Sequence, residues 1–151
     1  MPKLSGRGWR QETLPIASGS RHTGNTTSML RDYLFAKIHR CVVTACHPDY
    51  MGSIAIDPVL LQATGIEVNE KVLVADCDNG HRFETYVFAG KPGAGQIELN
   101  GAATKLTQIG HHLLVMSFCR LTAEEARNHR PRVVICGPDN SIAQTLTYPA
   151  P

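Results

Sequence analysis

The stretch YMGSIAIDP, residues 50–58, sets the local fold of this chain because it joins a strand to the start of a helix. The apolar run Ser53–Ile56 predicts a short strand. Asp57 and Pro58 then predict a helix start, since Asp is a preferred N-cap and Pro fits the first helical position. Gly65 is placed to end that helix. Both elements are short, which is typical of a small β protein with inserted helices.

Turn signals recur outward from this stretch and divide the chain into short segments. Asn79-Gly80 predicts a hairpin turn, because Asn-Gly readily takes two positive-φ positions. Thr122 and Glu125 form a capping-box pattern that opens a helix, and Pro131 prevents that helix from continuing. The other strands are predicted at Ala36–Thr44, Val68–Asp76, Arg82–Ala89, Gln96–Leu99, His112–Cys119 and Arg132–Cys136. Short strands with turns throughout indicate a mainly β barrel rather than a βαβ fold.

Length and composition indicate one globular domain. The chain has 151 residues, of which 42% are hydrophobic, and it contains no apolar stretch long enough to span a membrane. The formal net charge is +2, but residues 1–28 contain four basic residues and one acidic residue, so the remainder carries −1. The folded part is therefore not basic, which argues against a nucleic-acid partner.

The two ends of the chain differ from its middle. Residues 1–28 are rich in Gly, Ser, Thr and Arg and lack apolar periodicity, which is typical of a disordered leader. Their composition is similar to that of an organellar transit peptide, but no amphipathic helix is evident. A start codon assigned too far upstream, with Met29 as the natural start, is the simpler interpretation. We expect the domain over residues 29–140 and a loose tail over residues 141–151.

The cysteines favour a reducing compartment. They form no C-x-x-C pair, and their odd number disfavours a closed set of disulfides. The cytoplasm fits this pattern best, and no metal is expected, because the cysteines and histidines lack metal-ligand spacing. The five are Cys41, Cys46, Cys77, Cys119 and Cys136.

The Gly52-Ser53 pair by itself indicates only a turn, because Gly accepts positive φ and Ser bonds neighbouring backbone. Three other motifs change this interpretation: Lys37-Ile38-His39-Arg40, NGHRFETY at residues 79–86, and Asn100-Gly101-Ala102-Ala103. In order and spacing, the four motifs resemble those of the pyruvoyl-dependent aspartate 1-decarboxylases, from Met29 to about Asn140. Met51, Thr104 and Gly93-Ala94-Gly95 depart from the common family pattern, but none of them is assigned to catalysis.

The resemblance implies a fold, an assembly and an activity. The fold is a double-psi β-barrel with short helices, in a cytoplasmic homotetramer of cleaved α and β chains with active sites between subunits. The activity is decarboxylation of L-aspartate to β-alanine and CO₂ for pantothenate and coenzyme A biosynthesis. A maturation helper protein is a further partner that the resemblance leaves open.

The resemblance also implies a cofactor made from the chain. Decarboxylation leaves a carbanion that needs an electron sink, and no Rossmann glycine pattern, P-loop or pyridoxal-phosphate lysine motif supplies one. In this family the Ser53 Oγ would attack the Gly52 carbonyl, and elimination would cut the chain. The implied cofactor is a pyruvoyl group derived from Ser53, which forms a Schiff base with the substrate amine without metal or pyridoxal phosphate.

The resemblance assigns roles to the remaining motif residues. Thr85 donates a hydrogen bond to the Gly52 carbonyl during cutting, and Tyr50 lines the cleavage region. Arg82 binds the distal carboxylate of the substrate with its planar fork, and Tyr86 is the proton donor. Further contacts to the substrate or the pyruvoyl group fall to Lys37, Asn100, Gly101, Ala102 and Ala103. No role is assigned to His39, His111 or His112.

Strand periodicity makes one of these assignments awkward. Arg82 and Tyr86 share a strand face, whereas Thr85 points to the other face. A β-bulge between them, or a Thr85 contributed by a neighbouring subunit, would resolve the conflict. By the same period of two, Lys37 and His39 share a face.

Two other functions stay open. In the first, the protein is a self-cleaving hydrolase in which Ser53 becomes an N-terminal nucleophile. In the second, it is an uncut barrel that binds a small acid or another protein. The three functions differ in whether the chain is cut and whether residue 53 keeps its amine.

Overall fold

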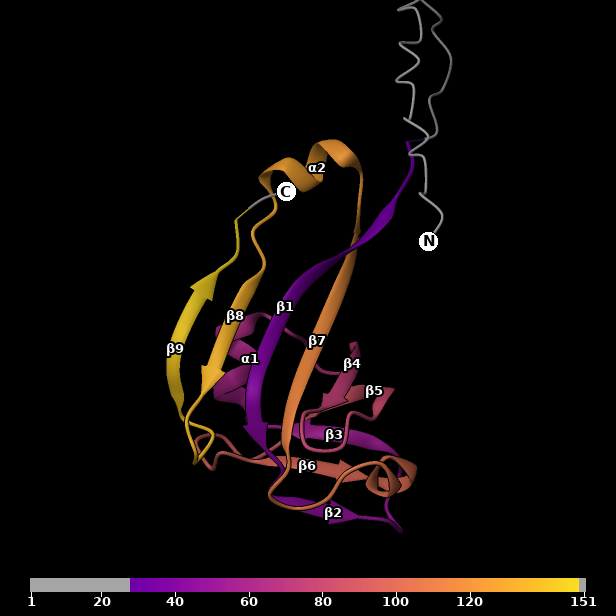
Figure 1. Cartoon of the computed structure of the whole chain (residues 1–151), viewed down its shortest axis with the longest axis vertical. Helices are drawn as coiled ribbons and strands as arrows, with labels where there is room; N and C mark the ends of the chain where they lie inside the picture. The colour runs from indigo at the N-terminus through magenta and orange to yellow at the C-terminus, as the bar shows by residue number, and fades with distance from the viewer. Residues whose placement is uncertain (1–27, 150–151) are drawn as a thin grey trace, which may run out of the picture.

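A computed structural model describes residues 28–149 (Figure 1). The strands are β1 Arg31–Val42, β2 Ala45–His47, β3 Ser53–Ile56, β4 Lys71–Asp76, β5 Arg82–Ala89, β6 Ile97–Asn100, β7 His112–Leu121, β8 Arg132–Cys136 and β9 Ile142–Thr147. The helices are α1 Pro58–Thr64, α2 Ala123–Asn128 and the 3₁₀ helix η1 Gly101–Lys105. Apart from Ser28, the predicted leader lies outside the described residues.

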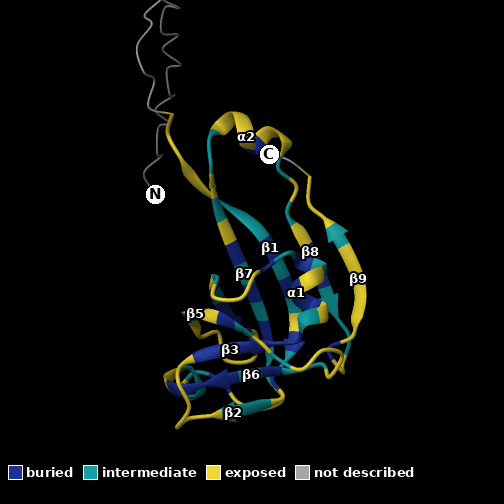
Figure 2. Cartoon of the chain, turned by 180° about the vertical axis from the view of Figure 1, so that it is seen from behind, coloured by how far each residue is buried: buried dark blue, intermediate teal, exposed yellow. Residues whose placement is uncertain are grey.

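The architecture is mainly β, as predicted. Nine strands form one sheet in the order β2-β6-β3-β5-β4-β7-β1-β8-β9. The two longest strands, β1 and β7, pair antiparallel and form the long central ribbon of Figure 1. β3 pairs parallel with β5 and antiparallel with β6, so it lies between two partners. This placement leaves β3 wholly buried, as Figure 2 shows.

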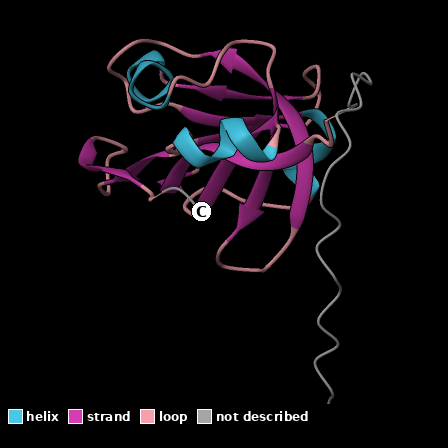
Figure 3. Ribbon diagram, turned by 90° about the horizontal axis from the view of Figure 1, so that it is seen from above, coloured by secondary structure: helices cyan, strands magenta, loops and turns pink. Residues whose placement is uncertain are grey.

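The sheet curls around a single core. Six strand spacings separate β6 from β8 in sheet order, which is about 29 Å in a flat sheet. Yet Leu99 of β6 and Val134 of β8 belong to the same buried cluster as Ile54 of β3 and Leu60 of α1. These residues share a core because the sheet bends back on itself, and Figure 3 shows strands on two sides of the molecule. The structure is consistent with the predicted β-barrel; its double-psi form stays a prediction.

The helix boundaries follow their predicted caps. Asp57 is the N-cap of α1, with its Oδ1 accepting the Val59 N–H at 2.9 Å, and Gly65 ends the helix in the left-handed conformation at φ 81°. Thr122 and Glu125 form the complete capping box of α2. Local sequence therefore predicts both helix starts, because each cap is satisfied within a few residues.

Three details differ from the sequence predictions. β2 was not predicted, and it consists of only three residues. In the β4–β5 turn only Gly80 has positive φ, because the Asp76 carboxylate accepts the N–H groups of Asp78 and Asn79 and shapes a longer turn. Within the predicted loose tail, Ile142–Thr147 form the strand β9, which pairs with β8. β9 is mostly exposed, so no apolar pattern signals it.

No helix within residues 28–149 is long and apolar enough to cross a membrane.

Asp57 also ties α1 to a distant turn. Its Oδ1 accepts the Gly93 N–H at 3.0 Å, and its Oδ2 accepts the Gly95 N–H at 2.7 Å. Burial raises the pKa of Asp57, but the hydrogen bonds from these backbone groups together outweigh burial and lower it. The ionised carboxylate is therefore the form that the fold stabilises.

We predict that Asp57→Asn lowers the free energy of unfolding by about 1–3 kcal/mol at neutral pH, because an amide NH₂ then faces the Gly95 N–H. The pKa of Asp57 is lower in the folded chain, so its stabilisation is complete above the unfolded pKa and is lost as pH falls through the folded pKa. Urea unfolding of both proteins at several pH values should show the difference shrinking on acidification. A difference that stays constant with pH would contradict this explanation.

Candidate active site

Ser53 and Asn100 form a buried polar pair across β3 and β6. The two residues are direct partners in the antiparallel register. The Asn100 Nδ2 donates to the Ser53 Oγ at 2.8 Å, and the two residues are 5% and 0% exposed. Buried polar groups need partners, and here each provides one for the other. The hydroxyl is thus held at a fixed position next to the Gly52-Ser53 bond.

Gly101 packs directly against the cleavage motif. Its φ is +64°, and a Cβ at this residue would lie 2.9 Å from the Gly52 Cα and from the Tyr50 carbonyl oxygen. Both the backbone conformation and the contact therefore require glycine. At Gly52 a Cβ would instead meet only the Asn100 carbonyl oxygen at 3.8 Å, an ordinary contact.

β5 lines the other side of β3. In the parallel register Ile54 is paired with Val87. Ser53 comes directly before Ile54 on β3, and Tyr86 comes directly before Val87 on β5. Tyr86 is 39% exposed and packs edge-on against Phe88, with ring centroids 5.4 Å apart. Tyr86 is therefore placed at the level of Ser53, one strand away.

Side chains alternate along β5 without interruption. Arg82, Glu84 and Tyr86 are exposed, while Thr85 is half-buried on the opposite face. The pairing of β5 with β4 continues from Arg82 to Tyr86 without a bulge. The predicted alternation is therefore confirmed, and a bulge is excluded as the means of turning Thr85 and Tyr86 to one side.

Two hollows flank β3 and its neighbours. A hollow of about 350 Å³ is bordered by His47, Tyr50, Ala55, Phe88, Ala89, Glu98 and Asn100. Another of about 430 Å³ is bordered by Asn69, Lys71, Glu84, Thr85 and Tyr86. Four of the sequence-predicted site residues border one or the other: Tyr50, Thr85, Tyr86 and Asn100. Ser53 borders neither hollow and is hydrogen-bonded to Asn100.

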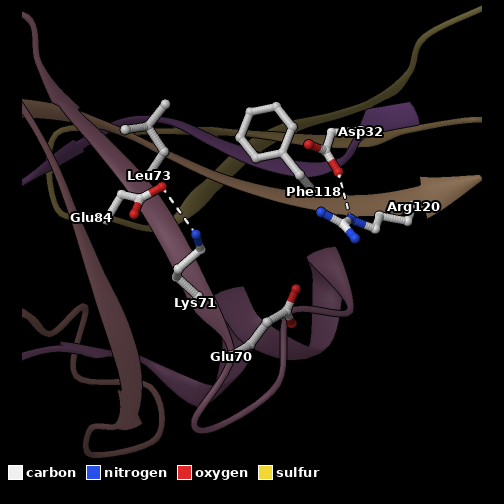
Figure 4. A pocket seen from close by; sticks show the side chains of 7 residues that line it. All are labelled: Asp32, Glu70, Lys71, Leu73, Glu84, Phe118 and Arg120. Atoms are coloured by element: carbon white, nitrogen blue, oxygen red, sulfur yellow. Dashed lines mark hydrogen bonds and ion pairs between the residues drawn. The ribbon is translucent and has the colours of Figure 1, made fainter. Parts of the chain in front are cut away.

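A larger hollow, of about 510 Å³, lies elsewhere (Figure 4). Its charged groups already pair with one another, with Lys71 to Glu84 at 3.1 Å and Arg120 to Asp32 at 3.3 Å. The Glu70 carboxylate, which also lines this hollow, accepts a hydrogen bond from the Ser117 hydroxyl. Three acidic and two basic side chains line this hollow, so it offers no net positive charge to an acidic ligand.

The structure does not bring every predicted residue together. Lys37 lies on β1, where its Nζ donates to the Tyr148 Oη at 2.8 Å, and three strands separate β1 from β3 in sheet order. Arg82 begins β5, about 13 Å along the strand from Tyr86. In η1, Ala102 is exposed and Ala103 packs against the core. A single chain thus assembles the Gly52-Ser53 surroundings but holds both cations apart from them.

The tip of the β4–β5 hairpin is tied to the segment after η1, a link that sequence reasoning missed. The Asn79 Nδ2 donates to the Leu106 carbonyl oxygen at 2.9 Å, and the His81 Nδ1 lies 3.1 Å from the same oxygen. Both residues belong to the NGHRFETY motif, which was the available signal. The link joins the strand that carries Arg82 to the segment that carries Asn100.

Titratable groups near these motifs have structural partners. Asp76, Asp78 and His111 each bring one metal-type ligand atom within 4.8 Å of the others, which sequence spacing did not reveal. The Asp76 Oδ2 lies 2.7 Å from the His111 Nδ1, and its Oδ1 accepts two backbone N–H groups. Burial raises the pKa of Asp76, but these hydrogen bonds outweigh burial and lower it. The arrangement therefore acts as an anchor for the hairpin.

His39 shares a face with Lys37, as predicted, because no register shift separates them. Its Nδ1 is buried without a hydrogen bond from any described residue. Burial, and then the charges of Lys37 and Arg40, lowers the pKa of His39. Its imidazole is therefore neutral at neutral pH.

Comparisons with known proteins show the family to which this chain is related. A family model described as aspartate decarboxylase matches residues 29–143. The chain belongs to the aspartate decarboxylase family. A Caldicellulosiruptor bescii protein named aspartate 1-decarboxylase is 48% identical over 116 residues, covering 77% of this chain and 91% of that relative. A Staphylococcus aureus protein of the same name is 45% identical over 118 residues, covering 78% and 93%. The family predicted from the motifs is confirmed.

Gly101 and Gly80 provide a matched test of packing in this aspartate decarboxylase family member. Both have positive φ, at 64° and 79°, but a Cβ at Gly80 would meet no atom within 4 Å. We predict that Gly80→Ala costs about 1–2 kcal/mol of stability for its φ alone, and that Gly101→Ala costs at least about 1 kcal/mol more. Urea unfolding measures both. Equal losses in the free energy of unfolding would show that close contact between residue 101 and Gly52 does not affect stability.

Proposed function

We propose that this protein decarboxylates L-aspartate to β-alanine and CO₂, after cutting its own chain between Gly52 and Ser53. The β-alanine would supply pantothenate and coenzyme A synthesis. Two observations support the proposal: the relatives named aspartate 1-decarboxylase match over more than nine-tenths of their length, and the Ser53 hydroxyl is wholly buried beside the Gly52 carbonyl. The second observation carries the argument, because a surface turn would leave this hydroxyl in water.

The cut begins with attack of the Ser53 Oγ on the Gly52 carbonyl carbon. An O–C bond forms, the Gly52–Ser53 C–N bond breaks, and an ester replaces the amide. Removal of the Ser53 α-proton then breaks the Cβ–Oγ bond, which leaves Gly52 with a free carboxylate. Water replaces the nitrogen at residue 53, and ammonia departs. The balance is the chain plus water, giving two fragments plus ammonia.

The surroundings of residue 53 fit a pyruvoyl group derived from the chain. Such a group is smaller than the serine from which it forms, so the buried position needs no further space. The Asn100 Nδ2, which already donates to the Ser53 Oγ, is a donor suited to a carbonyl oxygen. When formed, the group supplies the electron sink that decarboxylation needs.

The chain's own side chains orient the substrate and move its protons. Arg82 offers a bidentate grip on the distal carboxylate, and it is exposed without an ion pair to any described residue. Lys37 adds a second positive contact. The Tyr86 hydroxyl, at the level of Ser53, donates the proton that replaces CO₂, and Thr85 supports the Gly52 carbonyl during cutting.

These roles require a second copy of the chain. Thr85 and Tyr86 point to opposite faces of an unbulged strand, so one chain does not turn both toward the same Ser53. Lys37 and Arg82 lie apart from Ser53 within one chain as well. In a homotetramer of cleaved chains, an active site at a subunit boundary would take Thr85 and Tyr86 from different chains. It would also bring Lys37 and Arg82 of one chain close to residue 53 of another.

We predict that Ser53→Ala gives one uncut chain on a denaturing gel and no β-alanine from L-aspartate, because it removes the attacking oxygen. Ser117→Ala is the matched control. Ser117, on β7, is also a buried serine, and its hydroxyl donates a hydrogen bond to the Glu70 carboxylate. This control should be cut and active. A cut Ser53→Ala chain would refute the proposed chemistry.

A further inference from the structure

The Lys37 ammonium is held by a residue that lies just beyond β9. Its Nζ donates to the Tyr148 Oη at 2.8 Å and lies 5.1 Å from the centre of that ring. We propose that Tyr148 is a positioning residue, which fixes the Lys37 ammonium where a substrate carboxylate binds it. This inference rests on the proposed function, which assigns Lys37 to the substrate.

Three neighbouring strands build the contact. β1 pairs parallel with β8, where Lys37 is matched with Val133, and β8 pairs antiparallel with β9, where Arg132 is matched with Thr147. The chain stays attached beyond β9, because the Tyr148 N–H donates to the Pro131 carbonyl oxygen at 3.0 Å. Residues 111 positions apart in sequence are thus placed side by side by backbone pairing.

The chemistry of the contact favours positioning. A neutral phenol accepts one hydrogen bond from an ammonium that has three N–H donors, so two donors and the full charge stay available to a carboxylate. An Asp or Glu partner would instead neutralise the lysine. Within residues 28–149, Lys37 has no acidic partner at ion-pair distance. The contact therefore holds the side chain without cancelling its charge.

The contact also reduces the entropy that substrate binding costs. A lysine side chain has a flexible four-carbon stem, and a free stem loses its rotamer freedom when the ammonium is fixed on a ligand. Tyr148 restricts that stem before substrate arrives. The effect belongs to binding rather than to the chemical step, so it should alter KM and leave kcat nearly unchanged.

The test uses the full, self-processed protein and the variant Tyr148→Phe, which removes only the hydroxyl. We expect KM for L-aspartate to rise roughly 3- to 10-fold, the range for one lost hydrogen bond, with kcat within about twofold. The dissociation constant of succinate, a dicarboxylate without an amine, should rise by a similar factor in calorimetry. Tyr33→Phe is the control, because Tyr33 lies on β1 beside Cys119 and makes no side-chain hydrogen bond to a described residue. Gels and thermal unfolding verify that each variant is cut and folded.

A double-mutant cycle separates positioning from a general structural role. In a Lys37→Ala background, Tyr148→Phe should no longer change KM or succinate binding, because its target is gone. An equal effect in both backgrounds would overturn the inference, and so would an unchanged KM. A lowered KM would show that Tyr148 obstructs the site. If the parent protein neither forms β-alanine nor binds succinate, the proposed function itself fails, and the inference fails with it.

Discussion

The pairing of β3 with β6 is the contact on which the rest of the site depends. It sets Ser53 opposite Asn100, and it brings the backbone of Gly101 against that of Gly52. The same two strands contribute Ile54 and Leu99 to the core. Because apolar packing fixes their register, the hydroxyl and its amide partner meet without a flexible loop between them. The same pair of strands therefore contributes to the hydrophobic core and positions the Ser53 hydroxyl.

The charged residues of the predicted site are placed on the surface rather than in the core. Arg82 and Lys37 stand on strand faces away from the core, where a long cationic side chain keeps its charge in water at little cost. Neither has an acidic partner among the described residues. The Ser53–Asn100 pair, in contrast, carries no charge and tolerates burial because each group is hydrogen-bonded. The active site that we propose at a subunit boundary would bring this buried neutral pair together with cations from another chain.

Sequence predicted the elements whose signals are local. Asp57 and Thr122 cap their helices within a few residues, and β5 alternates with the expected period. The β9 strand escaped prediction because its side chains are mostly exposed and backbone pairing with β8 holds it in place. The β4–β5 turn took another shape because the Asp76 carboxylate accepts the N–H groups of Asp78 and Asn79 and lengthens the turn.

The site was predictable as a set of motifs, but not as a geometry. Asn100 and Ser53 lie 47 positions apart, and Tyr148 and Lys37 lie 111 apart, so only the sheet register brings each pair together. Tyr148 belongs to no motif, and its part of the chain was expected to be loose. Long-range contacts of this kind depend on tertiary pairing that no local pattern encodes.

The central claim is that residue 53 ceases to be a serine, and the intact mass of the purified protein in denaturant tests it most directly. We expect two chains, one ending at Gly52, whose masses sum to the full chain plus water minus ammonia. Fragments that sum to the full chain plus water would identify a hydrolase that keeps its amine. A single uncut chain would contradict self-cleavage altogether.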